Sequence, residues 1–446
     1  MTNLILGRVR ILGSWSLLVG TILLVQTTIP AQAPSNAQQT RTRWEKLVYE
    51  DAPAVIRETT LALEKNPQNA VALRMRSSAF YRNNEPEKGK ADATAVLALL
   101  KNPASAEEFE AKCYAERRAE QYDDAISDCT KAIELDPRYA WAYYNRGNAN
   151  EGKKRREQAI ADYTKAIELN SNFVDPYSRR GSVYSENKEY DKALTDYTKV
   201  IGLDPTRASG FNSRGYVYNQ KKEFDLAIAD FSKAVNLEAK SVWSFENRGS
   251  AYAGKKEYGL AIEDYSRAIE LEPKRAAAYY RRGLAYSFKE EHNLAIADFT
   301  KVVELAPKAA SAYIERGNSY FSKNDNGLAK ADLANAIELD PKSFRPYYDR
   351  GNIFFKENQF DLAIADYAKA IELDPKFAYA YNNRANSYRQ KKDFDRVIAD
   401  ATKAIELDPK LVVAYTIRSL AYEAKGEKAL AEDDRRKAKE LEGQPK

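Results

Sequence analysis

The residues of this chain that could do chemistry are few. There is one histidine, His292, in 446 residues, and there are two cysteines, Cys113 and Cys129. A zinc site needs several such ligands together, and a Ser-His-Asp triad needs a histidine beside a nucleophile. His292 stands in a turn position that aromatic residues occupy elsewhere, so we interpret it as a packing substitute. The chain is therefore predicted to be no enzyme and to hold no metal or cofactor.

Short catalytic motifs do not change this prediction. Residues Ser185 to Lys188 match S-x-x-K, a match that chance provides in a chain this rich in serine and lysine. The recurring glycines lie inside predicted helices rather than after strands, so no glycine loop that binds phosphate is expected.

The two cysteines are a candidate disulfide pair. Cys113 and Cys129 fall in one 34-residue unit, and an antiparallel hairpin that turns near Gln121 brings them to about the same height. An oxidising compartment would allow the bond. The alternative is two small buried thiols, because the separation that a disulfide tolerates is narrow.

Arginine and aspartate recur in two columns. The arginine column contains Arg146, Arg180, Arg214, Arg248, Arg282, Arg316, Arg350, Arg384 and Arg418. The aspartate column contains Asp128, Asp162, Asp196, Asp230, Asp264, Asp298, Asp332, Asp366, Asp400 and Asp434. Because Arg350 and Asp366 stand almost symmetrically about a turn, we predict a ladder of Arg–Asp pairs, within a hairpin or between hairpins. The competing hypothesis is an arginine-lined channel for anions.

The element that positions these columns is a 34-residue unit, clearest in residues 344–377. Tyr347, Gly351 and Phe354 follow the spacing of one helical face, and a second amphipathic pattern comes after them. Pro375 disfavours helical geometry in the residue before it and ends the second pattern. Each unit is therefore predicted to be a hairpin of two α-helices.

The unit recurs along most of the chain. Glycines repeat at Gly147, Gly181, Gly215, Gly249, Gly283, Gly317 and Gly351. Alanines repeat at Ala125, Ala159, Ala193, Ala227, Ala261, Ala295, Ala329 and Ala363. Prolines repeat at Pro137, Pro205, Pro273, Pro307, Pro341, Pro375 and Pro409. This order of small, aromatic, alanine and proline positions resembles the tetratricopeptide-repeat family. Local departures are Ser171 and Ala239 for proline, Cys113 for glycine and Val397 for alanine.

The resemblance implies an all-α fold, an α-solenoid of tandem 34-residue helix-turn-helix repeats that form a right-handed superhelix. The fixed period favours one continuous solenoid over the two or three domains that the length allows. A net charge of only +5, to which Arg8 and Arg10 contribute, is too balanced for a nucleic-acid surface.

The ends of the chain differ from its middle. Residues 1–33 place Arg8 and Arg10 before an apolar run that leads to Ala31-Gln32-Ala33, as in a secretory signal peptide. We therefore expect an exported protein, periplasmic or secreted, or one anchored to the inner membrane if this segment is retained. Residues 34–43 are expected to be a flexible linker.

The repeat array is expected to begin at residue 44. Residues 44–105 are interpreted as two degenerate repeats, with two extra residues placed in the turn at 83–87. Residues 106–411 contain nine regular repeats. Residues 412–446 form a capping repeat, because Arg435 replaces an aromatic residue that would otherwise be buried against a next hairpin.

In the family that this chain resembles, the first helices of successive units line a concave groove that holds a partner. The equivalent columns run through Arg345, Tyr348 and Asn352. The predicted groove residues are Trp141, Tyr144, Asn148, Asn212, Tyr216, Trp243, Tyr280, Asn318, Arg345, Tyr348, Asn352, Tyr379, Asn382 and Asn386. Trp141, Trp243, Tyr280 and Tyr348 are the expected anchors, because the repeat gives no packing reason for tryptophan at 141 or 243.

Two functions fit this lining. The first is a non-enzymatic protein-interaction scaffold of the bacterial cell envelope that binds extended polypeptide. The asparagines are similar to a ladder in the helical region of O-linked N-acetylglucosamine transferase, although Ser182, Ser250 and Leu284 interrupt it. The lysine–asparagine–arginine clamp of family members that hold chaperone tails is not found. The second function is a carbohydrate-binding module of a polysaccharide export system, since aromatic faces stack on sugars. No nucleic-acid partner is expected. Contact with a membrane is expected only through an N-terminal segment that remains uncleaved.

Overall fold

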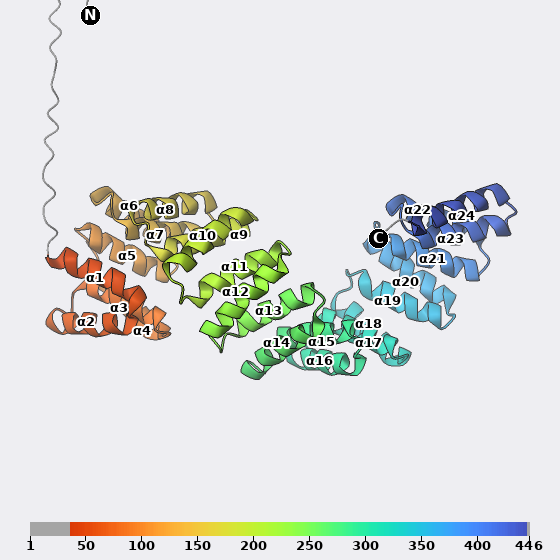
Figure 1. The fold of residues 1–446 in the computed structure, drawn as a ribbon, viewed down its shortest axis with the longest axis horizontal. Helices are drawn as coiled ribbons and strands as arrows, with labels where there is room; N and C mark the ends of the chain where they lie inside the picture. The colour runs from red at the N-terminus through yellow and green to blue at the C-terminus, as the bar shows by residue number, and fades with distance from the viewer. Residues whose placement is uncertain (1–35, 444–446) are drawn as a thin grey trace, which may run out of the picture. The chain divides into compact units, whose positions relative to one another are not determined.

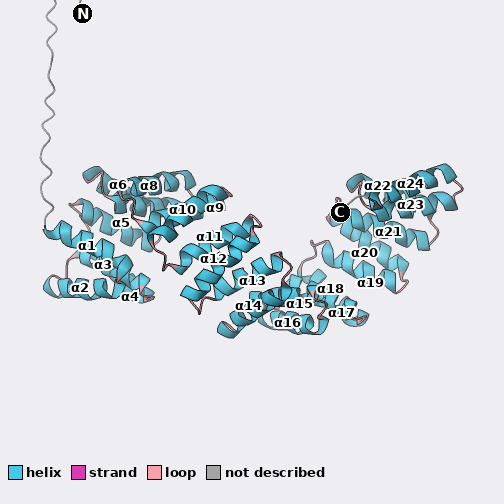
Figure 2. Ribbon diagram, viewed as in Figure 1, coloured by secondary structure: helices cyan, strands magenta, loops and turns pink. Residues whose placement is uncertain are grey.

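The computed structural model describes residues 36–443, and every regular element in that range is an α-helix (Figure 2). The helices follow one another as α1 to α24 (Figure 1). The chain forms two compact units, Met1–Asp128 and Cys129–Lys446, and the division falls inside α6. This is the predicted α-solenoid of tandem hairpins. Within residues 36–443 no helix is both long and apolar enough to cross a membrane.

The helices of the first unit are α1 (Asn36–Glu50), α2 (Ala52–Lys65), α3 (Ala70–Arg82), α4 (Pro86–Leu99) and α5 (Ala106–Arg118), followed by α6 (Tyr122–Leu135). The second unit continues with α7 (Ala140–Gly152), α8 (Arg156–Leu169), α9 (Val174–Glu186), α10 (Tyr190–Leu203), α11 (Ala208–Gln220), α12 (Phe224–Leu237), α13 (Val242–Gly254), α14 (Tyr258–Leu271) and α15 (Ala276–Phe288). Its remaining helices are α16 (His292–Leu305), α17 (Ala310–Ser322), α18 (Asn326–Leu339), α19 (Arg345–Lys356), α20 (Phe360–Leu373), α21 (Ala378–Gln390), α22 (Phe394–Leu407), α23 (Val412–Ala424) and α24 (Lys428–Glu442).

Each hairpin turn is closed by backbone hydrogen bonds. In the turn after α9, Lys188 has a φ of 62° and the Glu189 amide donates to the Tyr184 carbonyl over 2.8 Å. The left-handed backbone of Lys188 and this hydrogen bond, which joins residues five apart, end the first helix. They provide partners for carbonyl groups that have no hydrogen bond within the helix. The second helix α20 ends before Pro375, as predicted. Asp374, before Pro375, is extended with φ of −133° and accepts a hydrogen bond from the Lys376 amide over 3.0 Å.

The two helices of a hairpin meet where a ring packs on a glycine. A Cβ added to Gly351 would lie 2.7 Å from Tyr367, so any side chain at 351 would displace this buried ring. The same contact joins Gly147 to Tyr163 and Gly283 to Phe299. The glycine and aromatic columns are therefore two halves of one packing contact.

The predicted Arg–Asp ladder is confirmed. Arg282 donates from Nε and Nη2 to the carboxylate of Asp298 over 2.9 and 2.8 Å, and from Nη1 to Ser266 of the preceding hairpin over 2.9 Å. Every arginine of the column pairs in this way with the aspartate sixteen residues later. These side chains are mostly buried and paired, so they form no open anion channel.

The structure corrects two predictions in the first unit. The two extra residues lie in the connection 100–105, which replaces the regular four-residue connection, and not in the turn at 83–87. The turn keeps its length because Arg76 and Asp92, sixteen residues apart, form the same pair as in the ladder. The linker expected at 34–43 is mostly helical, since α1 begins at Asn36 and its Arg41 pairs with Glu107 of α5.

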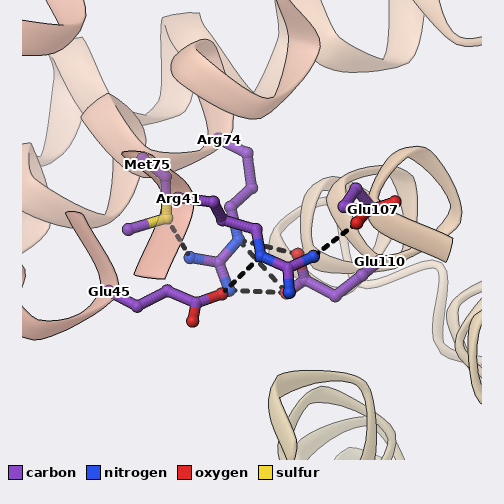
Figure 3. A network of polar contacts seen from close by, with 6 residues as sticks. All are labelled: Arg41, Glu45, Arg74, Met75, Glu107 and Glu110. Atoms are coloured by element: carbon purple, nitrogen blue, oxygen red, sulfur yellow. Dashed lines mark hydrogen bonds and ion pairs between the residues drawn. The ribbon is translucent and has the colours of Figure 1, made fainter. Parts of the chain in front are cut away.

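A buried ion-pair network holds α1 against α3 and α5 (Figure 3). Arg74 and Glu110 are 1% and 2% exposed, and the Arg74 Nε atom donates to both carboxylate oxygens over 3.1 Å. On α1, Arg41 donates to Glu107 over 2.7 Å and lies 3.4 Å from Glu45. Burial raises the pKa of Glu45 from 4.5 to about 7, although Arg41 and Arg74 act in the opposite direction.

Breaking one ladder pair should destabilise the second unit. Arg282→Gln leaves the carboxylate of Asp298, 7% exposed, without its ion pair. We expect the free energy of unfolding, measured by urea titration of the helical circular dichroism signal, to fall by about 3 kcal/mol.

The matched control is Lys301→Gln, which removes the exposed pair of Lys301 with Glu304 and should cost less than about 0.5 kcal/mol. The double variant Arg282→Met, Asp298→Leu should lose less than Arg282→Gln, because no charge is left buried alone. Equal losses in Arg282→Gln and Lys301→Gln would contradict a partly buried ladder.

The packing of α1 should weaken as pH rises. Because the pKa of Glu45 is raised on folding, its contribution is fully present below pH 4.5 and is lost as pH rises through about 7. Glu45→Gln carries no charge at this position at any pH. At pH 8, amide hydrogen exchange of α1, corrected for intrinsic rates, should therefore be slower in Glu45→Gln than in wild type. The difference should correspond to roughly 2 kcal/mol in the free energy of opening. Glu64→Gln, at an exposed position on α2, should have no such effect. The same exchange at pH 8 in wild type and Glu45→Gln would exclude this role.

Candidate partner-binding groove

From α9 to α23, the first helices of the second unit form a continuous row. α9 contacts α11, α11 contacts α13, and this pattern continues to α23. Among the described helices of this unit, successive second helices such as α10 and α12 make no comparable contact. The hairpins therefore approach each other more closely on the first-helix side, which makes it the inner side of the stack. We call this row of helix faces, from α7 to α21, the groove.

The structure places all the predicted binding residues on these first helices. They are Trp141, Tyr144 and Asn148 on α7, Asn212 and Tyr216 on α11, Trp243 on α13, Tyr280 on α15, Asn318 on α17, Arg345, Tyr348 and Asn352 on α19, and Tyr379, Asn382 and Asn386 on α21. They occupy equivalent turns of successive helices. Their contacts with a partner remain a prediction.

Trp141 corrects the expectation that the repeat gives it no packing role. The ring is 7% exposed, and its centroid lies 4.5 Å from Phe173 and 5.8 Å from Tyr144. Phe173 lies in the connection after α8. The sequence of a single repeat unit does not show that this residue is a neighbour of Trp141. Trp141 therefore has a packing role in this structure, and its assignment as an anchor for a partner stays a prediction.

Trp243 has the opposite environment. It is 42% exposed, and its ring lies 6.4 Å from that of Tyr216, which is 39% exposed, with 32° between the two planes. On its other side it meets the buried ring of Phe231 edge-on at 6.3 Å. Trp243 and Tyr216 thus present two accessible ring faces, and the buried ring of Phe231 packs behind Trp243. This pair can stack on a planar or apolar group of a partner.

The groove asparagines are bonded at one end of the amide. Asn148 Oδ1 lies 3.0 Å from the hydroxyl oxygen of Tyr163, Asn212 donates to Ser244 over 2.8 Å, and Asn382 donates to Asn383 over 3.0 Å. The opposite amide atom of each, Asn148 Nδ2, Asn212 Oδ1 and Asn382 Oδ1, is buried and has no hydrogen-bond partner within the described residues. A buried polar atom without a partner costs free energy.

A charged cluster between α17 and α19 was not predicted. Asp349 accepts from Asn318 over 3.1 Å, and Arg345 pairs with Glu315 over 2.8 Å and lies 3.7 Å from Asp349. The pKa of Asp349 is raised to about 6, chiefly by burial and to a smaller extent by Glu315, against the opposite effects of Asn318 and Arg345. Asp349 and Glu315 each lie one residue away from a predicted groove column, so the sequence pattern did not single them out.

A polar pocket on α9 was also missed. A cavity of about 240 Å³ is lined by Ser178, Arg179 and Ser182 of α9, together with Tyr197, Arg207 and Ser213. Ser178 and Ser182 stand in the same columns as Tyr348 and Asn352. Searching those columns for any polar residue, and not only for rings and amides, would have found them.

Neither cysteine is free. Cys113 on α5 and Cys129 on α6 are both disulfide-bonded. Two unreactive buried thiols, the alternative that the sequence left open, therefore do not describe this structure. Within residues 36–443 no group of three or more histidine, cysteine, aspartate or glutamate side chains could hold a metal ion.

Models of one repeat family match most of the second unit. The model described as TPR repeat matches residues 114–154, 254–287, 317–356 and 351–392. Two models described as tetratricopeptide repeat match residues 140–173, 174–207 and 378–411, and residues 208–241 and 276–308. Together these matches cover more than half of the chain. No match is found among curated proteins.

Solved structures with similar folds include YrrB, described as a TPR protein with an unusual peptide-binding site. It is 27% identical, with 41% of this chain and 95% of YrrB covered and a TM-score of 0.37. The MamA protein is 29% identical, with 38% and 92% covered and a TM-score of 0.36. A tetratricopeptide repeat protein from Parabacteroides merdae is 22% identical, with 53% and 93% covered and a TM-score of 0.43.

The two groove tryptophans should respond differently to alanine. Trp141→Ala removes a buried ring and should lower the free energy of unfolding by about 3 kcal/mol or more. Trp243→Ala removes a partly exposed ring and should cost about 1 kcal/mol or less. Urea unfolding of each variant measures the difference, and Phe288→Ala, a residue 65% exposed on α15, is the control for an exposed ring. A Trp141→Ala variant as stable as Phe288→Ala would contradict the packing role of Trp141.

Proposed function

This chain belongs to the tetratricopeptide-repeat family, and on that premise we propose that it is a non-enzymatic scaffold for protein–protein interaction that holds an extended polypeptide in the groove. The second unit supplies the groove through its first helices. The ladder and the ring–glycine contacts hold these helices in place from the side of the second helices. The first-helix faces are therefore available for a partner.

The observation that carries this proposal is the set of one-sided amides. Asn148 has an unpartnered donor, and Asn212 and Asn382 have unpartnered acceptors. An extended polypeptide offers one N–H and one C=O per residue, which are the groups that these amides lack. Backbone recognition of this kind is independent of the partner's side chains, so it suits a scaffold that binds unfolded segments.

A second candidate function is carbohydrate binding, and the exposed pair of Tyr216 and Trp243 favours it. Two rings with 32° between their planes form a platform on which a sugar ring can stack. Amide side chains can bond sugar hydroxyls as well as peptide groups.

The proposed location is outside the cytoplasm, in the envelope or the secreted fraction. Two observations support it. Residues 1–33, which lie outside the described part of the chain, have the sequence of an export signal. Disulfide-bonded cysteines at 113 and 129 fit an oxidising compartment.

A peptide library tests the scaffold. The full chain should retain a reproducible set of unstructured peptides from an immobilised random library. The double variant Asn212→Ala, Asn382→Ala should bind a retained peptide about tenfold more weakly by fluorescence anisotropy, because two backbone hydrogen bonds are lost.

The matched control is Asn236→Ala, Asn335→Ala, two exposed asparagines on the second helices α12 and α18. It should leave the affinity within about twofold of wild type. Retention of no peptide, or an equal loss in both double variants, would count against the scaffold. Retention of an oligosaccharide from a glycan array, with loss on Trp243→Ala, would favour the second candidate.

A further inference from the structure

We propose that two copies of this chain associate through a surface of α14, α16 and α18, which we call the outer patch. Its residues are Leu260, Phe288, Leu294 and Leu328, together with the cavity beside His292. These residues lie on the second helices and at the last residue of α15, whereas the groove runs along the first helices. The association is therefore separate from the proposed function, and a dimer would carry two grooves.

The outer patch is apolar and exposed. Leu260, Leu294 and Leu328 are 42%, 48% and 54% exposed, and Phe288, at 65%, is the most exposed large apolar side chain among the described residues. These four side chains expose on the order of 350 Å², which is about the largest apolar patch of a typical monomer. An apolar patch of this size is typical of a surface that a protein partner covers.

Ion pairs that join neighbouring hairpins along this edge are missing at the outer patch. Elsewhere the turn lysine of one hairpin pairs with an aspartate at the start of the preceding second helix. Such pairs are Lys221–Asp191, Lys255–Asp225, Lys391–Asp361 and Lys425–Asp395. On α14, α16 and α18 the aspartate is replaced by Gly259, Asn293 and Gly327. The leucines of the outer patch therefore have no carboxylate beside them in the sequence, and a partner can cover them without burying one.

The residues along this edge are symmetric about α16. The second and third residues of each second helix from α10 to α22 are Asp191-Lys192, Asp225-Leu226, Gly259-Leu260, Asn293-Leu294, Gly327-Leu328, Asp361-Leu362 and Asp395-Arg396. A two-fold axis at α16 would place Leu260 against Leu328 of the second copy, and Leu294 against its own counterpart. A dimer with two-fold symmetry needs a surface that is complementary to itself, and this pattern provides one.

Phe288 and the cavity beside His292 match each other in the same arrangement. Phe288 stacks on Tyr258, with ring centroids 5.1 Å apart and 9° between the planes, on the α14 side of α16. On the α18 side, Ser322 takes the place of this ring, and a cavity of about 390 Å³ opens beside His292 and Lys323. The two-fold axis therefore brings the exposed side of Phe288 of one copy to the cavity of the other.

The cavity suits an aromatic ring. Leu294 and the methylene groups of Lys323 provide apolar contact. The ammonium group of Lys323 can lie over the face of an entering ring, which attracts it electrostatically. The ring would thus fill the space that Ser322 leaves open.

The charges around the cavity are nearly balanced within one copy. Glu291 pairs with Lys289 over 2.5 Å, and Lys323 lies 3.7 Å from Asp325. Glu290 is exposed to solvent. Water and salt screen an exposed charge, so two copies meet with little repulsion.

The size of the outer patch predicts a weak dimer. Specific, stable interfaces bury about 800 Å² on each partner, which the outer patch reaches only with its polar surroundings. We therefore expect a dissociation constant between about 1 and 100 μM. Well below its dissociation constant the chain is monomeric, so Phe288→Ala remains a control for stability in dilute unfolding titrations.

Sedimentation equilibrium of the full chain tests the dimer. The weight-average mass should rise from 50.4 kDa toward twice that value as the concentration increases through this range. Leu294→Arg should weaken association more than about tenfold without changing the helical circular dichroism signal, because arginine already stands at the equivalent position 396. The matched control is Leu430→Arg, at the same position of α24 and 46% exposed, which should change the dissociation constant less than about twofold.

Ser322→Phe distinguishes the cavity from general apolar attraction. The variant supplies a ring at the position that Phe288 occupies one hairpin earlier, so it should fill the cavity within each copy and weaken association about tenfold. An association that depended only on exposed apolar area would become tighter, because the variant adds a ring to the surface.

Cross-linking tests the two-fold arrangement. A Cβ added to Gly259 or Gly327 meets nothing within 4 Å, so Gly259→Cys and Gly327→Cys preserve the fold and the leucines. Both native cysteines are disulfide-bonded, so each variant has one free thiol. In a mixture, a short bis-maleimide should join the two variants at least about fivefold more efficiently than it joins either variant to itself.

A wild-type chain that stays at 50.4 kDa up to about 100 μM would overturn the dimer. Equal effects of Leu294→Arg and Leu430→Arg, or tighter association of Ser322→Phe, would overturn the outer patch as its interface. Self-linking of Gly259→Cys as efficient as linking in the mixture would overturn the two-fold arrangement. None of these results changes peptide retention by the groove, so the proposed function fails or stands on its own experiment.

Discussion

The contact between a ring of the second helix and a glycine of the first helix is the constraint on which the hairpins of the second unit depend. Tyr367 packs so closely on Gly351 that no side chain fits between them. Where the pattern changes, the space between the helices stays filled, and at α17 and α18 the buried Leu333 takes the place of the ring against Gly317. At α21 and α22 the small residue is Ala385 and the ring is replaced by Ala401, both fully buried. The interhelical distance is thus kept by complementary volumes and not by one residue type.

The Arg–Asp ladder fixes the orientation of the helices that this packing brings together. Most arginines of the column join the aspartate of their own hairpin to a hydroxyl of the preceding hairpin, as Arg282 does with Asp298 and Ser266. The guanidinium fork fixes both the turn within a hairpin and the step between hairpins. Arg350 and Arg384 lack the hydroxyl, because alanine stands at 334 and 368, yet both keep the bond to aspartate. The pair within the hairpin is therefore the constant part of the ladder.

These contacts involve the sides of the two helices that face each other. The residue types on the groove side of the first helices can therefore differ from one repeat to the next. Along the same columns the chain places a buried tryptophan at 141, serines at 178 and 182, and an exposed tryptophan at 243. The groove is consequently a row of different local sites on a uniform frame. An amide column, an aromatic pair, a charged cluster at Asp349 and a polar pocket at Arg207 follow one another within it. In the proposed scaffold, such a row of sites would suit a long flexible ligand better than a compact one.

The sequence by itself determined the hairpins, their period and the Arg–Asp ladder, because these depend on contacts between residues at fixed separations within a repeat. It also predicted correctly that the columns proposed to bind a partner lie on the first helices. Only the tertiary structure decided which side chains in those columns are exposed, since exposure depends on neighbours outside the repeat pattern. Phe173 covers Trp141, whereas Trp243 is 42% exposed. The raised pKa of Glu45 could likewise not be predicted from the sequence, because the burial and the charges around one side chain are set by several segments that fold together.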